Sequence, residues 1–164
     1  MELKQLRKAL AEEAKEAGIC REWLEKIRRA PSREYLLQLF AKGLDFAILT
    51  DFPSAGLAAE FDDIAPHYGI YLHRKGVWSA DRKKRVIARE TTVDPATFQG
   101  YDVGEVYALR GSAVKVKARG NAIVAVTVEE GGFAEMEASE QACIRLFRHG
   151  GQIVTRGNVK IIKS

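Results

Sequence analysis

A cluster of cations around a tryptophan, in residues 73–89, is the stretch of this sequence best suited to chemistry. Seven of the 26 Lys and Arg residues fall in it. Cationic side chains neutralise phosphates and an exposed tryptophan stacks on an unpaired base, so the combination is typical of single-strand nucleic-acid binding. The other interpretation is a solvated linker whose tryptophan covers the end of the neighbouring domain. The candidate contacts are Arg74, Lys75, Trp78, Arg82, Lys83, Lys84, Arg85 and Arg89.

The charge of the chain is unevenly distributed. Residues 71–100 hold seven basic and three acidic side chains, a net charge of +4, whereas residues 1–70 hold ten basic and twelve acidic ones, a net charge of −2. Net charge governs non-specific association rather than fold. No recognised nucleic-acid motif accompanies the basic segment, so its charge alone does not identify a ligand.

The remaining reactive side chains form no catalytic or metal-binding pattern. Asp62 and Asp63 are adjacent, and neighbouring residues on a helix point about 100° apart, so their carboxylates do not converge on a metal. Ser139 and His149 lack the surrounding motif of a nucleophile elbow. The two cysteines lie far apart and outside any CxxC spacing, which indicates free thiols. We therefore expect no catalytic residue, metal or cofactor, and a protein that is not an enzyme.

The elements that must position these side chains are clearest in the last third of the chain, where residues 106–162 repeat every twenty residues. Glycine recurs at this interval, and apolar residues recur in the same register. The repeated positions are Gly111, Gly131 and Gly151; Val106, Val126 and Leu146; Gly104, Val124 and Ile144; and Val114, Ala134 and Val154.

Each period contains two short runs of alternating residues separated by turn-forming clusters, which is the pattern of strand, turn, strand, turn. In a β-solenoid, residue i stacks on residue i+20, so Lys115 lies over Glu135 and Lys117 over Glu137. The regular glycines favour this architecture. The alternative is an antiparallel β-sandwich or barrel, in which each run pairs with the next one along the chain.

The N-terminal part has helical periodicity and predicts about four helices, within residues 3–17, 23–27, 32–47 and 54–64. Ser32 is placed to cap the third of them. The period changes from 3.6 to 2 at Gly69. The sequence thus predicts an α+β protein with three parts: a helical unit at 1–69, a basic connector with the first strands at 70–100, and a solenoid-like domain at 101–164.

Several short segments resemble an uncharacterised family of short gut-bacterial proteins, whose genes often lie near phage or other mobile elements. The resemblance spans nearly the whole chain and implies no activity and no site residues. The solenoid-like tail alone is similar to polymerising bacterial β-solenoids and to the head domains of adhesins. The segments are Gly18-Ile-Cys20 with Trp23, Lys42-Gly-Leu-Asp-Phe46, Asp51-Phe-Pro-Ser54, Gly100-Tyr-Asp-Val103 and Gly157-Asn-Val-Lys-Ile-Ile162.

The expected function follows from this architecture. The sequence shows neither an eighteen-residue apolar span nor a signal-peptide pattern, so we expect a cytoplasmic protein without membrane contact. A solenoid needs both ends covered. We expect the helical unit to cap one end, and at the other end either the tail 158–164 covers the edge or two chains meet. This favours an interaction or scaffold protein with a protein partner or self-association. The alternative is a small nucleic-acid-associated regulator from a phage or mobile element, binding through 73–89.

Overall fold

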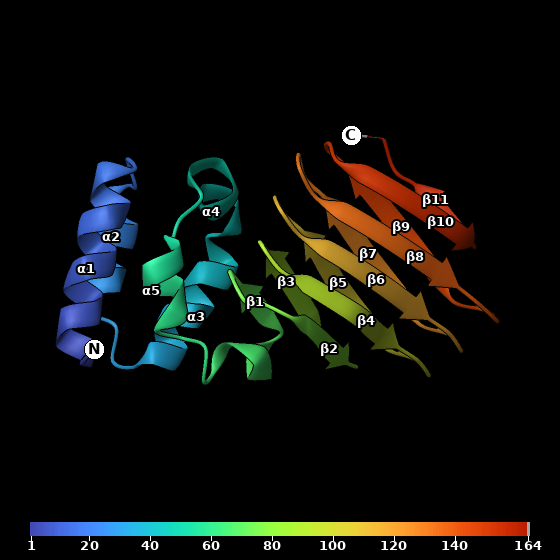
Figure 1. The fold of residues 1–164 in the computed structure, drawn as a ribbon, viewed down its shortest axis with the longest axis horizontal. Helices are drawn as coiled ribbons and strands as arrows, with labels where there is room; N and C mark the ends of the chain where they lie inside the picture. Colours follow the sequence, from blue (N-terminus) through green and yellow to red (C-terminus); the bar gives the residue numbers. More distant parts are fainter. Residues whose placement is uncertain (164) are drawn as a thin grey trace. The chain divides into compact units, whose positions relative to one another are not determined.

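The computed structural model describes residues 1–163 and divides the chain into two compact units. The first comprises Met1–Ile64 and is helical, and the second begins at Ala65 and is built of strands (Figure 1). This is the α+β organisation that the two sequence periodicities predict, and each unit is described by itself below.

The first unit consists of short amphipathic helices that bury leucines, alanines and one phenylalanine of α3 against one another. Ser32 caps α3 as predicted, because its Oγ accepts a hydrogen bond of 3.1 Å from the backbone N–H of Tyr35. The helices are α1 (Leu3–Glu16), α2 (Arg21–Arg28), α3 (Arg33–Lys42), α4 (Leu44–Thr50) and α5 (Ala55–Ala59).

The single helix predicted over residues 32–47 is in fact two helices, α3 and α4, separated by Gly43. The backbone of Gly43 leaves the helical region, with φ −96° and ψ 32°, while its N–H still donates to the carbonyl of Leu39. Glycine is among the residues least favourable to a helix interior, so the chain turns there at little cost. The apolar periodicity runs through the break and therefore did not reveal it.

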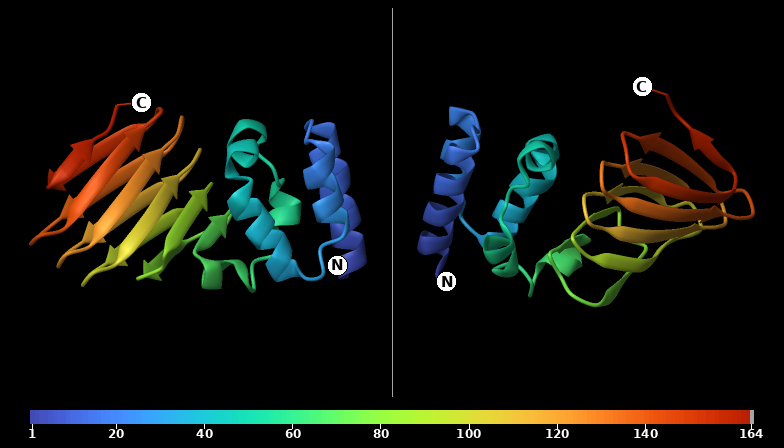
Figure 2. Two further views of the ribbon diagram at one scale, coloured as in Figure 1. Left: turned by 180° about the vertical axis from the view of Figure 1, so that it is seen from behind. Right: turned by 45° about the horizontal axis from the view of Figure 1, so that its top comes forward.

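The second unit is a flattened β-solenoid made of two parallel sheets. A short 3-10 helix, Ala65–Tyr68, precedes the first strand. Within the described residues, sheet A has six strands in the order β1-β3-β5-β7-β9-β11 and sheet B has five in the order β10-β8-β6-β4-β2. Figure 2 shows the chain passing from one sheet to the other at each edge.

The strands of sheet A are β1 (Ile70–Leu72), β3 (Arg85–Arg89), β5 (Val103–Ala108), β7 (Ile123–Val128), β9 (Cys143–Arg148) and β11 (Val159–Ile161). Those of sheet B are β2 (Val77–Asp81), β4 (Thr92–Phe98), β6 (Ala113–Ala118), β8 (Phe133–Ala138) and β10 (Gln152–Gly157). Residues 70–100, predicted as a connector with the first strands, form strands β1–β4 of the same two sheets.

The twenty-residue register is confirmed between β5 and β9. Val106 pairs with Val126, which pairs with Leu146, and these side chains point into the core between the sheets. On the outer face of sheet B, Lys115 lies beside Glu135 with 3.5 Å between their charged groups. Every strand pair among the described residues is parallel, which excludes the antiparallel sandwich or barrel.

The predicted column of Val114, Ala134 and Val154 is wrong in its last member. Strand β10 pairs with β8 at an interval of nineteen residues, so Ile153 lies beside Ala134 and Val154 lies beside Glu135. The turn before β10 spans residues 149–151, one residue fewer than the turn 129–132 before β8. Because side chains alternate between faces, this single residue moves Val154 from the core to the surface.

We use the word coil for one strand of each sheet with the turns that join them. The core is filled by pairing a large with a small side chain within each coil. Phe98 of sheet B reaches across to Gly104 of sheet A, where an added Cβ would lie only 2.2 Å from the phenylalanine ring. One coil further, Ala118 accompanies Val124, and after another coil Ala138 accompanies Ile144. All of these side chains are buried. The glycine in the column Gly104, Val124 and Ile144 therefore makes room for a ring.

One edge of the solenoid turns through a row of residues with left-handed backbone. Gly100, Gly120 and Glu140 occupy equivalent corners with φ of 62°, 67° and 56°. Glycine adopts this conformation without strain, whereas a side chain brings its Cβ close to the backbone. Glu140 therefore carries a strain that the corresponding glycines do not.

Replacing Glu140 by glycine should raise the free energy of unfolding by about 1 kcal/mol, because the relief of left-handed strain outweighs the extra entropy of the unfolded chain. Urea unfolding followed by circular dichroism measures the change. Gly120→Ala is the matched control and should destabilise, since its Cβ would lie 2.8 Å from the backbone nitrogen of Gly100. A lower unfolding free energy for Glu140→Gly would contradict the strain.

Candidate functional site

The basic segment 73–89 lies on the first coils of the solenoid. Arg74 and Lys75 occupy the turn between β1 and β2, and Trp78 lies in β2 at the edge of sheet B. The remaining candidate contacts follow in the turn after β2 and in β3, namely Arg82, Lys83, Lys84, Arg85 and Arg89. These residues therefore lie on strands of the solenoid and on the short turns that join them.

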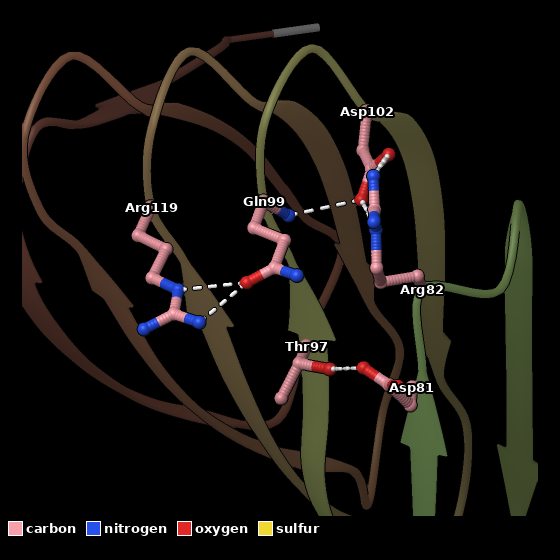
Figure 3. Close-up of polar contacts among 6 residues, drawn as sticks. All are labelled: Asp81, Arg82, Thr97, Gln99, Asp102 and Arg119. Carbon is pink, nitrogen blue, oxygen red and sulfur yellow. Dashed lines mark hydrogen bonds and ion pairs between the residues drawn. The ribbon is translucent and has the colours of Figure 1, made fainter.

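Two of these arginines form ion pairs with acids twenty residues later, on the next coil. Arg82 donates through Nε and Nη2 to the carboxylate of Asp102, each at 2.9 Å. Arg85 donates through Nε to Glu105 at 3.2 Å. Figure 3 shows the Arg82 guanidinium lying against Asp102. The repeat therefore supplies an anion for these two members of the basic segment.

The Arg82 pair shifts the titration of its partner. Asp102 accepts hydrogen bonds from the Arg82 guanidinium and from the backbone N–H of Gln99, and together these lower the pKa of Asp102 to about 2. The same contact raises the pKa of Arg82. The Asp102 carboxylate is thus charged throughout the neutral pH range. It neutralises Arg82, a candidate phosphate contact of the basic segment.

The tryptophan of the segment is covered on one side. The Arg74 guanidinium carbon lies 4.1 Å from the centre of the Trp78 ring, and the ring packs against the buried core. Arg89 is only 1% exposed, so its side chain is part of the interior. Lys83 donates to the backbone carbonyl of His67 at 3.2 Å. Lys75 and Lys84 are exposed.

A groove of about 560 Å³ lies where the strands of sheet B end. Two contacts cross this surface: the Thr97 hydroxyl donates to Asp81 at 2.6 Å, and Arg119 Nε donates to Gln99 at 2.9 Å (Figure 3). The polar side chains that line the groove mostly bind one another between neighbouring coils. They therefore belong to the contacts that hold the stacked coils together. The lining residues are Asp81, Pro95, Thr97, Phe98, Gln99, Lys117, Ala118, Arg119, Glu137 and Ser139.

The reactive side chains considered in the sequence are kept apart. Ser139 follows β8 at one edge of the solenoid, whereas His149 follows β9 at the opposite edge, because the short turn 139–142 reverses the chain. His149 instead lies 2.8 Å from Glu129. Asp63 binds Arg33 through two contacts of 2.8 Å, and the guanidinium lowers the pKa of Asp63. Within residues 1–163, no three His, Cys, Asp or Glu side chains are grouped to hold a metal ion.

Sequence reasoning missed an apolar outer surface on sheet A. We call it the apolar face and define it as the outward-pointing side chains of β5, β7 and β9, with Tyr101 at its rim. Tyr101 is 85% exposed, Val103 72% and Ile123 44%. The signal was present in the run of uncharged residues 123–128, which is apolar except for Thr127 and is typical of a strand buried on both faces. The outward residues are Val103, Glu105, Tyr107, Ile123, Ala125, Thr127, Cys143, Arg145 and Phe147.

A second apolar surface lies at the end of the solenoid formed by β10 and β11, which we call the open end. In the described part of the tail, residues 158–163, the chain adds β11 to sheet A, beside β9, and Ser164 lies outside the described residues. Ile161 lies in register with the buried Leu146, yet its side chain is 59% exposed. The other inward-facing apolar residues here, Ile153 and Val159, are only partly buried.

Comparisons with known proteins add no assignment. No family model matches the chain, and neither the curated proteins nor the solved structures contain a match. Among the described residues, no helix is both long enough and apolar enough to cross a membrane. The two apolar surfaces and the paired basic segment are therefore the features from which a function must be argued.

Proposed function

We propose that this protein is a non-enzymatic scaffold that assembles with further copies of itself through the open end of its solenoid. The exposure of Ile161 carries this proposal. Its position belongs to the column of Val106, Val126 and Leu146, all of which are fully buried, and only a further layer would bury it in the same way. A second copy supplies such a layer.

The backbone at the open end supports the same conclusion. Strands β10 and β11 are the outermost strands of their sheets, so each presents one row of backbone donors and acceptors for pairing. The strands of the two sheets run in opposite directions. A two-fold axis that passes through the end parallel to the strands places β11 of one copy beside β10 of the other. An axis perpendicular to the strands places each of them beside its own counterpart. In both cases the neighbouring strands are antiparallel. Both sheets then continue into the partner.

The test is sedimentation velocity on the wild-type chain and on two variants that each gain one lysine. Ile161→Lys places the charge at an inward position of the open end, and Val154→Lys places it on the outer face of the same coil. We expect a dimer or larger assembly for the wild type and for Val154→Lys. For Ile161→Lys, association should weaken by about tenfold or more, equivalent to at least about 1.4 kcal/mol.

Salt dependence completes this experiment. Apolar burial and backbone pairing are little affected by ionic strength, so the assembly should persist from low to physiological salt. Thermal unfolding of both variants, measured in parallel, separates loss of association from loss of folding. A wild-type chain that stays monomeric at every concentration, or an Ile161→Lys variant that assembles like the wild type, would refute the proposal.

Nucleic-acid association through residues 73–89 is the second candidate, and the exposure of Lys75 and Lys84 favours it. Ion pairing of Arg82 and Arg85 reduces the charge offered to phosphates. The same sedimentation run with a mixed oligonucleotide decides the question. Co-sedimentation at low salt that is lost as salt rises, and abolished by Lys75→Glu with Lys84→Glu, would support this function.

A further inference from the structure

The apolar face of sheet A has the composition of a surface that is normally covered. Parallel sheets occur almost only with both faces buried, and the outward side chains of β7 are Ile123, Ala125 and Thr127, none of them charged. Contiguous exposed apolar surface on a protein marks an interaction site. This face is separate from the open end, so its role is independent of the function proposed above.

We propose that the apolar face binds the same face of a second copy of this chain, around a two-fold axis that runs along strand β7. Such an axis keeps the direction of the strands and exchanges β5 with β9 of the partner. Two sheets stacked face to face align their strands in this way. The interface is isologous, so every contact away from the axis occurs twice.

The register of the three strands makes this pairing complementary. Val103, Ile123 and Cys143 lie side by side, as do Glu105, Ala125 and Arg145. Exchange of β5 with β9 therefore places Glu105 over Arg145 of the other copy and Val103 over Cys143. Ile123 then faces its own counterpart on the axis. Tyr107 in the same way faces Phe147, which completes two aromatic pairs.

The charges select this axis over the alternative. A two-fold axis perpendicular to the strands would place Glu105 over Glu105 and Arg145 over Arg145, and like charges face to face oppose association. The axis along β7 instead places Glu105, which also accepts a hydrogen bond from Arg85 of its own copy, against Arg145 of the other copy. The unlike charges sit two coils apart on either side of the uncharged Ala125, as a symmetric dimer requires. Arg85 and Lys160 extend the same row beyond them, so two pairs of like charges meet at the rim and limit the strength of the dimer.

The size of the face sets the expected strength. Three strands about 4.8 Å apart, with six residues rising about 3.3 Å each, cover roughly 14 by 20 Å, or about 280 Å² in projection. A stable interface buries about 800 Å² on each partner. We therefore expect a weak dimer that forms at high concentration, or one reinforced when the open end also associates.

Charge reversal tests the pairing in a background that lacks the other interface. In Ile161→Lys, the remaining dimer should weaken about tenfold with Glu105→Lys or with Arg145→Glu, and the double variant should recover to within about threefold. Sedimentation equilibrium at high protein concentration measures this. Recovery in the double variant cannot arise from misfolding. Equal association of all four proteins, or no recovery, would overturn the proposal.

Cross-linking tests the position of the axis. In a Cys20→Ser, Cys143→Ala background, Ile123→Cys places two thiols opposite each other on stacked sheets about 10 Å apart, which suits a short bis-maleimide rather than a disulfide. Lys117→Cys, exposed on the outer face of sheet B, is the matched control. We expect at least a fivefold greater yield of covalent dimer at position 123. Equal yields would overturn this geometry, and this result is independent of whether Ile161→Lys changes assembly.

Discussion

Replacing Gly104 by isoleucine should lower the free energy of unfolding of the solenoid by about 3 kcal/mol or more. Sequence repetition alone suggests that this change is harmless, because the equivalent positions one and two coils later are Val124 and Ile144. The space at Gly104 is taken by the Phe98 ring, however, and the nearest ring carbon would lie 2.2 Å from an added Cβ. Urea unfolding monitored by circular dichroism measures the loss.

A double-mutant cycle identifies the cause. Phe98→Ala alone should cost about 3 to 5 kcal/mol by leaving a cavity. In the double variant the isoleucine fills part of that cavity, so the loss should be about 2 kcal/mol smaller than the sum of the two single losses. Strict additivity, or a Gly104→Ile variant as stable as the wild type, would show that the ring and the glycine do not share one space.

Replacing Val126 by aspartate should unfold the solenoid at room temperature. Val126 is fully buried between Val106 and Leu146 in the middle of the stack, so the carboxylate would lie among apolar side chains. An unpaired buried charge costs about 4 kcal/mol or more, which is comparable with the whole stability of a domain. Because each coil contacts only its neighbours, damage in the middle leaves the coils on either side without support.

The matched control is Thr127→Asp, which introduces the same side chain one residue later on the outer face. It should change the free energy of unfolding by less than about 1 kcal/mol, although it should weaken pairing through the apolar face. Circular dichroism should show loss of strand signal for Val126→Asp while the helical unit, with its own buried core, retains its helices. Equal stability of the two variants would contradict the assigned alternation of faces.

The sequence predicted the solenoid because its repeat is almost free of insertions. Between β5 and β9 the period is twenty residues, and counting alone placed Val106, Val126 and Leu146 in one column. The count failed where one turn is a residue shorter, and there Ile153 replaces Val154. Turn length depends on local backbone geometry, which the glycine-rich composition of residues 149–151 does not specify.

The candidate site was predictable only in part. Positive charge is visible in the composition, but its neutralisation is not, because Asp102 and Glu105 become neighbours of Arg82 and Arg85 only when the coils stack. The same stacking creates the apolar face: Val103, Ile123 and Cys143 are distant in sequence and adjacent in space. Alternating charged and apolar residues mark the outer face of β6 and β8, whereas both alternate sets in β7 are uncharged, so the sequence does not distinguish its outer face from its inner one.

The parallel register also determines how such a protein lengthens or shortens. Removing or duplicating one twenty-residue segment preserves the register of the strands, even where the sizes of core side chains, such as Phe98 against Gly104, must adjust. An insertion or deletion of another length shifts that register or must be absorbed in a turn. Each such step changes the length of the stack by about 4.8 Å. The length of the solenoid can therefore change in steps of one coil, while the strands that form its two ends stay the same.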